Sequence, residues 1–207
     1  MPQKQQTTSG QQSKPSKNGP RPSGRPEIAI SRNLLERYAT EDELQWLYER
    51  AKEIKPGRNV VVLGAGPGVM ALALKEGNPL IDLTLVDKSS CQWAIAYLNE
   101  ADLINVRTFT GDSVAVGTTW CEGPVDLLVV DADHTEAGVR ADIAAWLPQL
   151  PIGSQVFFHD YDADETWFAE QERYPGVKVA VDQLMAGHEI ICRVGTAIVY
   201  QIIDKEG

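Results

Sequence analysis

The sequence predicts an α/β fold: a doubly wound, mostly parallel sheet of seven strands with helices on both faces and a C-terminal antiparallel hairpin. Short apolar runs alternate along the 207 residues with segments whose apolar residues recur at helical spacing. Such alternation is typical of parallel strands joined by helices. Three glycines at alternate positions follow the first run, and only Gly195 and Thr196 separate two late strand-like runs. A connection of two residues indicates a hairpin.

Five apolar runs are expected to form the parallel strands, because each is short, rich in β-branched residues and bounded by polar or glycine-containing segments. They cover residues 59–63, 80–86, 105–110, 125–130 and 154–159. The hairpin strands are expected at residues 188–194 and 197–203.

Five helices are expected between and around these strands, at residues 41–54, 68–77, 89–103, 135–150 and 175–187. Ser89 or Ser90 is expected to cap the third helix, and Asp133 is one candidate for the cap of the fourth. Pro175 is expected to begin the last helix and Gly187 to end it.

The first 26 residues differ from the rest of the chain in composition. They contain five basic residues and no acid, and they are rich in Gln, Ser, Pro and Gly. Such a segment buries too little apolar surface to offset its ordering entropy, so we expect a disordered basic tail, either simply solvated or in contact with an anionic partner. Residues 27–207 are expected to form one domain.

The charge of the expected domain disfavours some classes of partner. Because the tail carries +5, the net charge of −10 leaves −15 on residues 27–207, which argues against nucleic-acid binding. No apolar run is long enough to span a membrane, and no signal-peptide segment is visible, so we expect no membrane association and a cytoplasmic location. The three cysteines lack metal-site spacing and are expected to be reduced.

The glycine turn, residues 64–68 (Gly-Ala-Gly-Pro-Gly), lies where sheets of this kind bind nucleotides. A dinucleotide fingerprint would have its third small residue at position 69, which is Val69. A nucleoside without a diphosphate therefore fits better, and S-adenosylmethionine is such a ligand, with a carboxylate that a helix N-terminus can receive. The alternative is a turn that merely joins a strand to a helix.

Two acids follow the second and third expected strands. Asp87 lies 23 residues after Gly64, where a carboxylate can accept hydrogen bonds from both ribose hydroxyls of NAD or of S-adenosylmethionine. Asp112 and its neighbouring amides are suited to contact an adenine edge or to cap a helix, and the two roles are compatible. Both acids support a nucleoside ligand without identifying it.

Residues 27–201 resemble the class I S-adenosylmethionine-dependent methyltransferases. Residues 125–162 and 174–184 are similar to a small bacterial and phage-type family related to the metal-dependent, catechol-type O-methyltransferases. The resemblance implies a Rossmann-like fold with an antiparallel last strand. It also implies a cofactor site composed of Gly64, Ala65, Gly66, Pro67, Gly68, Asp87, Lys88, Asp112, Ser113 and Asp131. One departure is Val62, because many relatives have an acid two residues before the first glycine.

A second set of polar residues follows the fourth and fifth expected strands: Asp131, Asp133, His134, His159, Asp160, Asp162 and Asp164. In catechol-type relatives, an acid after the fourth strand binds the metal, a base follows three residues later, and two adjacent ligands come about 28 residues on. The resemblance therefore implies Asp131, His159 and Asp160 as ligands of a divalent metal. It also implies Asp131 and His134 as catalytic residues, with His134 as the general base.

The His-Asp pair at positions 159 and 160 stands where those relatives have Asp-Asn or Asp-Asp. Magnesium prefers oxygen ligands, so the imidazole favours manganese, iron or zinc, or a site without metal. His159 is alternatively a hydrogen-bonding partner of the substrate.

The implied reaction transfers a methyl group from S-adenosylmethionine to a small-molecule acceptor, with a hydroxyl as the expected acceptor group. A non-catalytic nucleoside-binding protein and a nicotinamide-dependent oxidoreductase remain as alternatives, because both use the same strand-turn-helix. Trp167, Phe168 and Tyr174 either cover the acceptor or pack against the sheet edge. Because little chain is left for a substrate lid, a second subunit that completes the pocket, and hence a homo-oligomer, is also expected.

Overall fold

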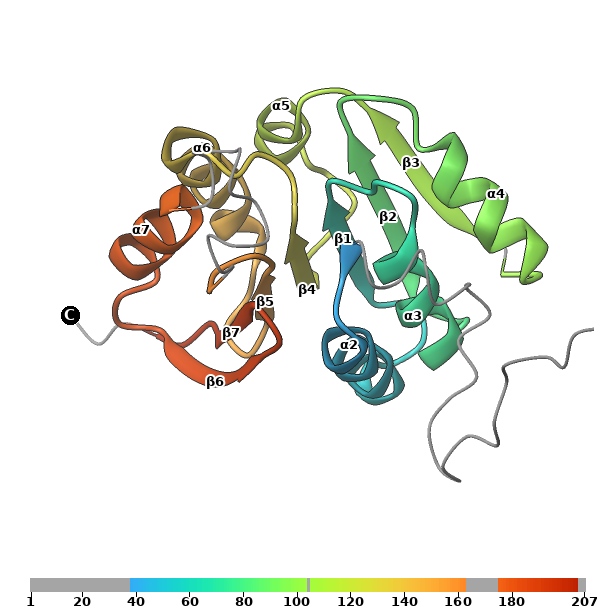
Figure 1. Ribbon diagram of the computed structural model, residues 1–207, viewed down its shortest axis with the longest axis horizontal. Coiled ribbons are helices and arrows are strands. Elements are labelled where there is room, and N and C mark those ends of the chain that lie inside the picture. The colour runs from blue at the N-terminus through green and yellow to red at the C-terminus, as the bar shows by residue number, and fades with distance from the viewer. Residues whose placement is uncertain (1–37, 104, 163–174, 205–207) are drawn as a thin grey trace, which may run out of the picture.

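The computed structural model describes residues 38–103, 105–162 and 175–204. Over these residues the chain forms one seven-stranded sheet with helices on both faces (Figure 1). The predictions for the basic tail, for Asp164 and for the three aromatic residues at 167, 168 and 174 lie outside the described residues.

The sheet has the predicted parallel core and antiparallel end. Its strands are β1 (Asn59–Leu63), β2 (Asp82–Asp87), β3 (Val106–Thr110), β4 (Val125–Val130), β5 (Gln155–Phe158), β6 (Glu189–Val194) and β7 (Ala197–Gln201). Their order is β3-β2-β1-β4-β5-β7-β6. Strands β1 to β5 pair in parallel, whereas β7 is antiparallel to both β5 and β6. The Rossmann-like fold class and the C-terminal hairpin are thus confirmed.

The helices form two layers, one on each face of the sheet. They are α2 (Glu41–Glu53), α3 (Val69–Gly77), α4 (Gln92–Glu100), α5 (Ser113–Thr118), α6 (Glu136–Trp146), a short 3-10 helix (Leu147–Gln149) and α7 (Pro175–Leu184). Helices α2, α3 and α4 cover one face, and α5, α6 and α7 cover the other (Figure 1). Along β1, Val60 and Val62 pack into the first layer, whereas Val61 and Leu63 pack into the second. Burial on both faces explains why this strand is apolar at consecutive positions.

Helix α4 starts later than predicted. Its N-cap is Cys91, and neither Ser89 nor Ser90 takes that position. Ser89 instead donates hydrogen bonds from its amide and its hydroxyl to Asp87. The hydroxyl of Ser90 accepts the amide of Gln92 inside the tight turn before the helix. Both serines therefore form hydrogen bonds within the loop after β2, and the helix begins only after Cys91.

A side-chain oxygen that accepts backbone amides caps both α5 and α6. Asp112 is the N-cap of α5 and accepts the amides of Val114 and Ala115, which confirms one of the two roles predicted for it. The cap of α6 is Thr135, which accepts the amide of Gly138, so the suggestion of Asp133 as the cap is wrong. Asp133 instead accepts the amide of Thr135.

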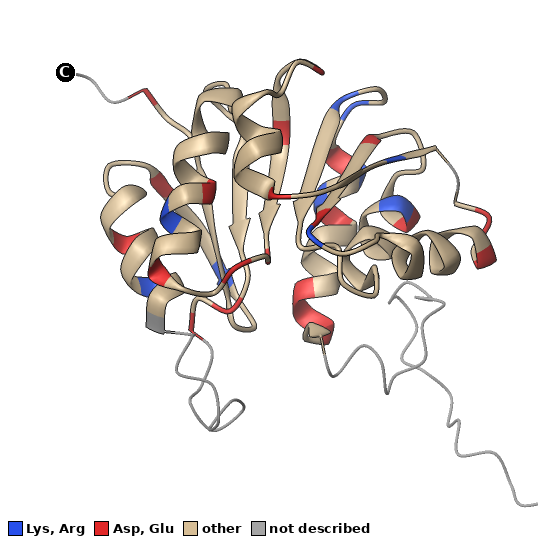
Figure 2. Ribbon diagram, turned by 90° about the horizontal axis from the view of Figure 1, so that it is seen from above, with Lys and Arg blue, Asp and Glu red and all other residues tan. Residues whose placement is uncertain are grey.

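Figure 2 shows acidic residues on most helices and loops, with Lys and Arg scattered among them. Several basic side chains form ion pairs with acidic ones: Arg58 with Asp126, Arg107 with Glu122 and Arg140 with Glu136. Among the described residues, no helix is both long and apolar enough to cross a membrane.

The topology collects polar residues at one edge of the sheet. The strand order reverses between β1 and β4: β2 and β3 lie on one side of β1, and β4 and β5 lie on the other. At such a point an open parallel sheet leaves a crevice at the carboxyl ends of its strands. Hydrogen bonds continue the ladder one residue past these strands. The amide of Gly64 donates to Val86 at 2.8 Å, and the amide of Asp131 to Leu63 at 2.9 Å. The glycine turn and the loop after β4 therefore leave the sheet side by side.

Candidate functional site

The glycine turn passes directly over the backbone that follows β4. Gly64 and Gly66 both have positive φ, 80° and 46°. A Cβ atom on Gly64 would lie 1.9 Å from the carbonyl oxygen of Asp131, whereas one on Gly66 would meet no atom within 4 Å. Gly64 is therefore required for packing, and Gly66 faces open space in which a ligand can approach the backbone.

Asp87 ends β2 beside this turn. Its Oδ2 accepts the amide of Gly66 at 3.1 Å, and its Oδ1 accepts the amide and the hydroxyl of Ser89 at 2.8 and 2.7 Å. These bonds orient the carboxylate at the open side of the turn. Val62, by contrast, is 2 % exposed in the apolar core, so β1 supplies no acid to the site.

The loop after β3 places Asp112 near Lys88 and turns Ser113 inward. Lys88 Nζ lies 3.9 Å from Asp112 Oδ2. The hydroxyl of Ser113 donates to the buried Asp142, and its carbonyl accepts the indole N–H of Trp146 at 3.0 Å. Burial raises the pKa of Asp142, against the hydrogen bond from Ser113. Because the hydroxyl and the carbonyl of Ser113 make these contacts, the backbone amide is the part left to contact a ligand.

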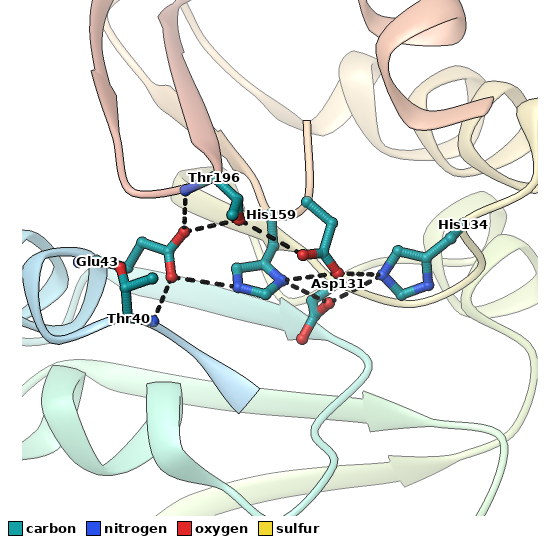
Figure 3. Close-up of polar contacts among 7 residues, drawn as sticks. Thr40, Glu43, Asp131, His134, His159 and Thr196 are labelled. Carbon is teal, nitrogen blue, oxygen red and sulfur yellow. Dashed lines mark hydrogen bonds and ion pairs between the residues drawn. The ribbon is translucent and has the colours of Figure 1, made fainter. Parts of the chain in front are cut away.

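Asp131, His134, His159 and Asp160 form one cluster at the ends of β4 and β5. One potential ligand atom from each lies within 4.8 Å of the other three. His134 Nε2 is 3.3 Å from Asp131 Oδ1 and 3.1 Å from Asp160 Oδ2. His159 Nδ1 is 3.2 and 3.3 Å from the same two oxygens. Two histidines from different loops thus share two carboxylates (Figure 3).

The other predicted acids of this region point elsewhere. Asp162 forms ion pairs with Lys178 and Arg193. The backbone hydrogen bond from Thr135 lowers the pKa of Asp133, which is used in the loop before α6. The structure therefore brings together four of the predicted residues and leaves these two out.

The distances between the imidazole nitrogens and the carboxylate oxygens of the cluster match the spacing of ligand atoms around a divalent cation. Charge-assisted N–H···O hydrogen bonds are usually about 2.7–2.9 Å long, shorter than the four contacts of 3.1–3.3 Å. Bonds of about 2.0–2.2 Å to a common ion would separate neighbouring ligand atoms by about 2.8–3.6 Å. An imidazole beside two carboxylates suits zinc, manganese or iron better than magnesium.

A further acid, Glu43 of α2, contacts this cluster, and no sequence motif assigned it there. Its Oε2 lies 3.4 Å from His159 Nε2 and accepts the amide of Thr40 at 2.6 Å. Its Oε1 accepts the amide and the hydroxyl of Thr196 at 2.7 and 2.9 Å (Figure 3). Glu43 is fully buried. Although burial opposes ionisation, the hydrogen bond and charge of His159 hold the pKa of Glu43 below its usual value.

Two features of the sequence could have identified Glu43. It lies four and eight residues before Leu47 and Ala51, on the buried stripe of α2. It also forms a capping box with Thr40. A carboxylate on an apolar stripe is rarely buried without a partner, so its position predicts a polar contact inside the fold.

Together with Glu43, the cluster combines three carboxylates with two imidazoles. Burial alone would lower the pKa of His134, but its contacts with Asp131 and Asp160 raise that pKa to about 9. Contacts with the same carboxylates and with Glu43 likewise outweigh burial and raise the pKa of His159 well above its usual value. Hydrogen bonds to both imidazoles, against burial, hold the pKa of Asp160 below its usual value. In the protein without a cation, His134 is therefore positively charged at neutral pH, and the charged form of His159 is favoured in the same way.

The raised pKa of His134 predicts that the cation-free protein loses stability in alkaline solution. The protonated ring stabilises the folded state fully below its unfolded pKa of 6.5, and this contribution disappears as the pH rises through about 9. The loss attributable to His134 is on the order of 3 kcal/mol. Urea unfolding at pH 6.5 and pH 9, in the presence of a chelator, should show a smaller loss in His134→Gln than in the wild type. Equal losses in the two proteins would contradict the prediction.

Comparison with known families identifies the central part of the chain. Residues 61–161 match a family model described as a methyltransferase domain. The match includes the glycine turn, Asp87, Asp112 and the four-residue cluster, but neither Glu43 nor Thr196. A sequence comparison with curated proteins finds no match.

Solved methyltransferase structures share the fold. A candidate caffeoyl-CoA O-methyltransferase from Staphylococcus aureus has a TM-score of 0.68 at 14 % identity, with 86 % of this chain and 93 % of that chain covered. A methyltransferase from Podospora anserina with bound S-adenosylhomocysteine gives 0.68 at 16 % identity, covering 82 % and 81 %. An O-methyltransferase from Bacillus cereus in complex with S-adenosylhomocysteine gives 0.59 at 18 % identity, covering 87 % and 84 %. Residues 61–161 are thus similar to a methyltransferase domain, and the fold of the chain is shared with solved methyltransferases.

Proposed function

We propose that this methyltransferase transfers the methyl group of S-adenosylmethionine to a hydroxyl of a small-molecule acceptor bound beside the four-residue cluster. The observation that carries the proposal is the contact between the two halves of the site, where Gly64 packs against the backbone of Asp131. A cofactor on the glycine turn would therefore lie next to the first residue of the cluster. Methyl transfer depends on such proximity, because it is a direct displacement in which the enzyme mainly aligns donor and acceptor.

The cofactor contacts follow from the loops that surround the turn. We assign the amino-acid part of S-adenosylmethionine to residues 64–68 and to the N-terminus of α3. The carboxylate of Asp87 accepts hydrogen bonds from the ribose hydroxyls, with Lys88 beside it. Asp112 and the backbone of Ser113 flank the adenine. The orientation of Asp87 by Gly66 and Ser89 supports this assignment.

The acceptor site is assigned to the cluster. Asp131, His159 and Asp160 would hold a divalent cation, which when bound lowers the pKa of an acceptor hydroxyl. His134 Nε2 takes the proton of that hydroxyl. His134 must be neutral to do so, and its raised pKa comes from Asp131 and Asp160. Positive charge placed at these two carboxylates returns His134 to the neutral, basic form at physiological pH.

The names of similar proteins agree with an oxygen acceptor. The structures from Staphylococcus aureus and Bacillus cereus are both described as O-methyltransferases, and the latter contains S-adenosylhomocysteine. They share the fold with this chain at 14 % and 18 % identity, so they support the reaction class and leave the acceptor open.

Binding of S-adenosylhomocysteine tests the proposal. At about 100 times its Kd, this product should stabilise the protein by about 2.7 kcal/mol, which corresponds to a rise in Tm of about 5–10 °C. Asp87→Ala should weaken binding at least about tenfold, because hydrogen bonds to the carboxylate are lost. Asp82→Ala, at the opposite end of β2, is the matched control and should bind normally.

The alternatives make different predictions in the same assay. A rise in Tm with NADH and none with S-adenosylhomocysteine would favour an oxidoreductase and overturn the proposal. Binding of S-adenosylhomocysteine without methyl transfer to any of a panel of hydroxylated compounds would indicate a non-catalytic binding protein.

A further inference from the structure

We propose that Glu43 is a positioning residue that fixes the ring and the tautomer of His159, so that Nδ1 of this histidine is presented to a cation at the cluster. The inference rests on the cation site of the proposed function. It extends that site to α2 and to the β6–β7 hairpin, which lie outside the segment matched by the methyltransferase family model.

The carboxylate of Glu43 is held by groups from two distant parts of the chain. One oxygen accepts the Thr40 amide at 2.6 Å, and the other accepts the amide and hydroxyl of Thr196 at 2.7 and 2.9 Å. The tip of the hairpin is packed tightly here, because a Cβ atom on Gly195 would lie 2.6 Å from Glu43 Oε1. The orientation of the carboxylate toward His159 is therefore fixed from both sides.

This orientation determines where His159 carries its proton. An ionised carboxylate only accepts hydrogen bonds, so the ring nitrogen facing Glu43, Nε2 at 3.4 Å, must carry a hydrogen. In the neutral ring, Nδ1 then has the lone pair. Nδ1 faces Asp131 Oδ1 and Asp160 Oδ2, at 3.2 and 3.3 Å, and both are acceptors, so without a cation Nδ1 also carries a hydrogen. A cation held by the two carboxylates would take the place of that proton and bind the Nδ1 lone pair.

Helix capping alone does not account for Glu43. Its capping box with Thr40 would be satisfied equally well by glutamine, and capping boxes need no burial. Full burial of a carboxylate is costly unless it is paired. The two remaining features, negative charge and contact with His159, match the acids that orient metal-binding histidines in other proteins through the second ring nitrogen.

Glu43→Gln tests the inference, because it keeps the shape and the capping hydrogen bond while removing the charge. Removing such a supporting acid typically weakens metal binding about 10- to 100-fold, and we expect this loss for Mn²⁺ and Zn²⁺, measured by competition with a chelator. The visible absorption bands of the Co²⁺-loaded protein should also change, because they report the ligand geometry. Glu49→Gln, on the exposed side of the same helix, is the matched control and should leave both readouts unchanged.

A milder variant covers the case in which Glu43→Gln folds poorly. Thr196→Val removes the hydroxyl that donates to Glu43 but keeps the backbone bond, so a smaller loss of Mn²⁺ affinity is expected with the same direction of spectral change. Unchanged metal affinity and spectrum in a folded Glu43→Gln would overturn the inference. So would a wild-type protein that binds none of the three metals. A wild-type protein that binds none of the metals would also remove the cation from the proposed acceptor site. Neither result affects the proposed cofactor site, which is decided separately by binding of S-adenosylhomocysteine.

Discussion

Gly64→Ala is expected to lower the free energy of unfolding by at least about 4 kcal/mol, which places it among the most destabilising single substitutions. The added Cβ would lie 1.9 and 2.5 Å from the carbonyl oxygen and carbon of Asp131, and 2.9 Å from Ala132 Cα. All three are backbone atoms, so no side chain can rotate away. The turn after β1 and the loop after β4 must then separate, which also disrupts the cofactor site. Urea unfolding, monitored by circular dichroism, measures the loss.

Gly66→Ala is the matched control for this effect. Gly66 also has positive φ, but a Cβ there would meet no atom within 4 Å. The expected cost is only the conformational one, about 1–2 kcal/mol. Because the added methyl group would enter the space assigned to the cofactor, affinity for S-adenosylhomocysteine should fall although the protein stays folded. If the two variants lose equal stability, the contact between Gly64 and Asp131 does not determine the packing of the turn.

The parallel strands could be predicted from sequence because central strands are buried on both faces of the sheet and are therefore apolar at consecutive positions. The bounds of β1 and β4, Asn59–Leu63 and Val125–Val130, agree with those expected. Each is an apolar run, and Gly64 or Asp131 ends it abruptly. Helix ends were less predictable, since the choice among Ser89, Ser90 and Cys91 depended on the hydrogen bonds that Asp87 makes with Ser89.

The membership of the cluster was also predictable, because residues at the carboxyl ends of β4 and β5 meet at one edge of the sheet. Spacing alone could not show that His134 and His159 share the same two carboxylate oxygens. It also could not separate these residues from Asp162, which pairs instead with Arg193 of the hairpin. Such pairings depend on side-chain directions and on long-range contacts.

Glu43 shows the same limit most clearly. In sequence it is an acid in the first turn of a helix, a common place for helix-stabilising acids. Its contacts inside the fold come from Thr196, 153 residues later, and from His159. These contacts exist only in the folded chain, where α2, the end of β5 and the β6–β7 hairpin lie together.

His134→Ala is expected to lower turnover by about 10²- to 10⁴-fold, the usual effect of removing a general base. The affinity for S-adenosylhomocysteine should stay unchanged, because His134 contacts Asp131 and Asp160 in the cluster assigned to the acceptor. Turnover should be measured with radiolabelled S-adenosylmethionine and the best acceptor from a panel of small hydroxylated compounds. His188→Ala, at a histidine that accepts the amide of Ile203 outside the cluster, is the control.

Chemical rescue and metal dependence distinguish a base from a residue that only shapes the site. Imidazole added to His134→Ala should restore part of the turnover if the missing group is a proton acceptor. In the wild type, the alkaline form of His134 should appear near pH 9 without metal, and a divalent cation should shift this transition toward neutral pH. The reason is that the cation replaces the proton as the positive charge facing Asp131 and Asp160. Full turnover in His134→Ala would exclude the base role and leave deprotonation to the cation or to solvent.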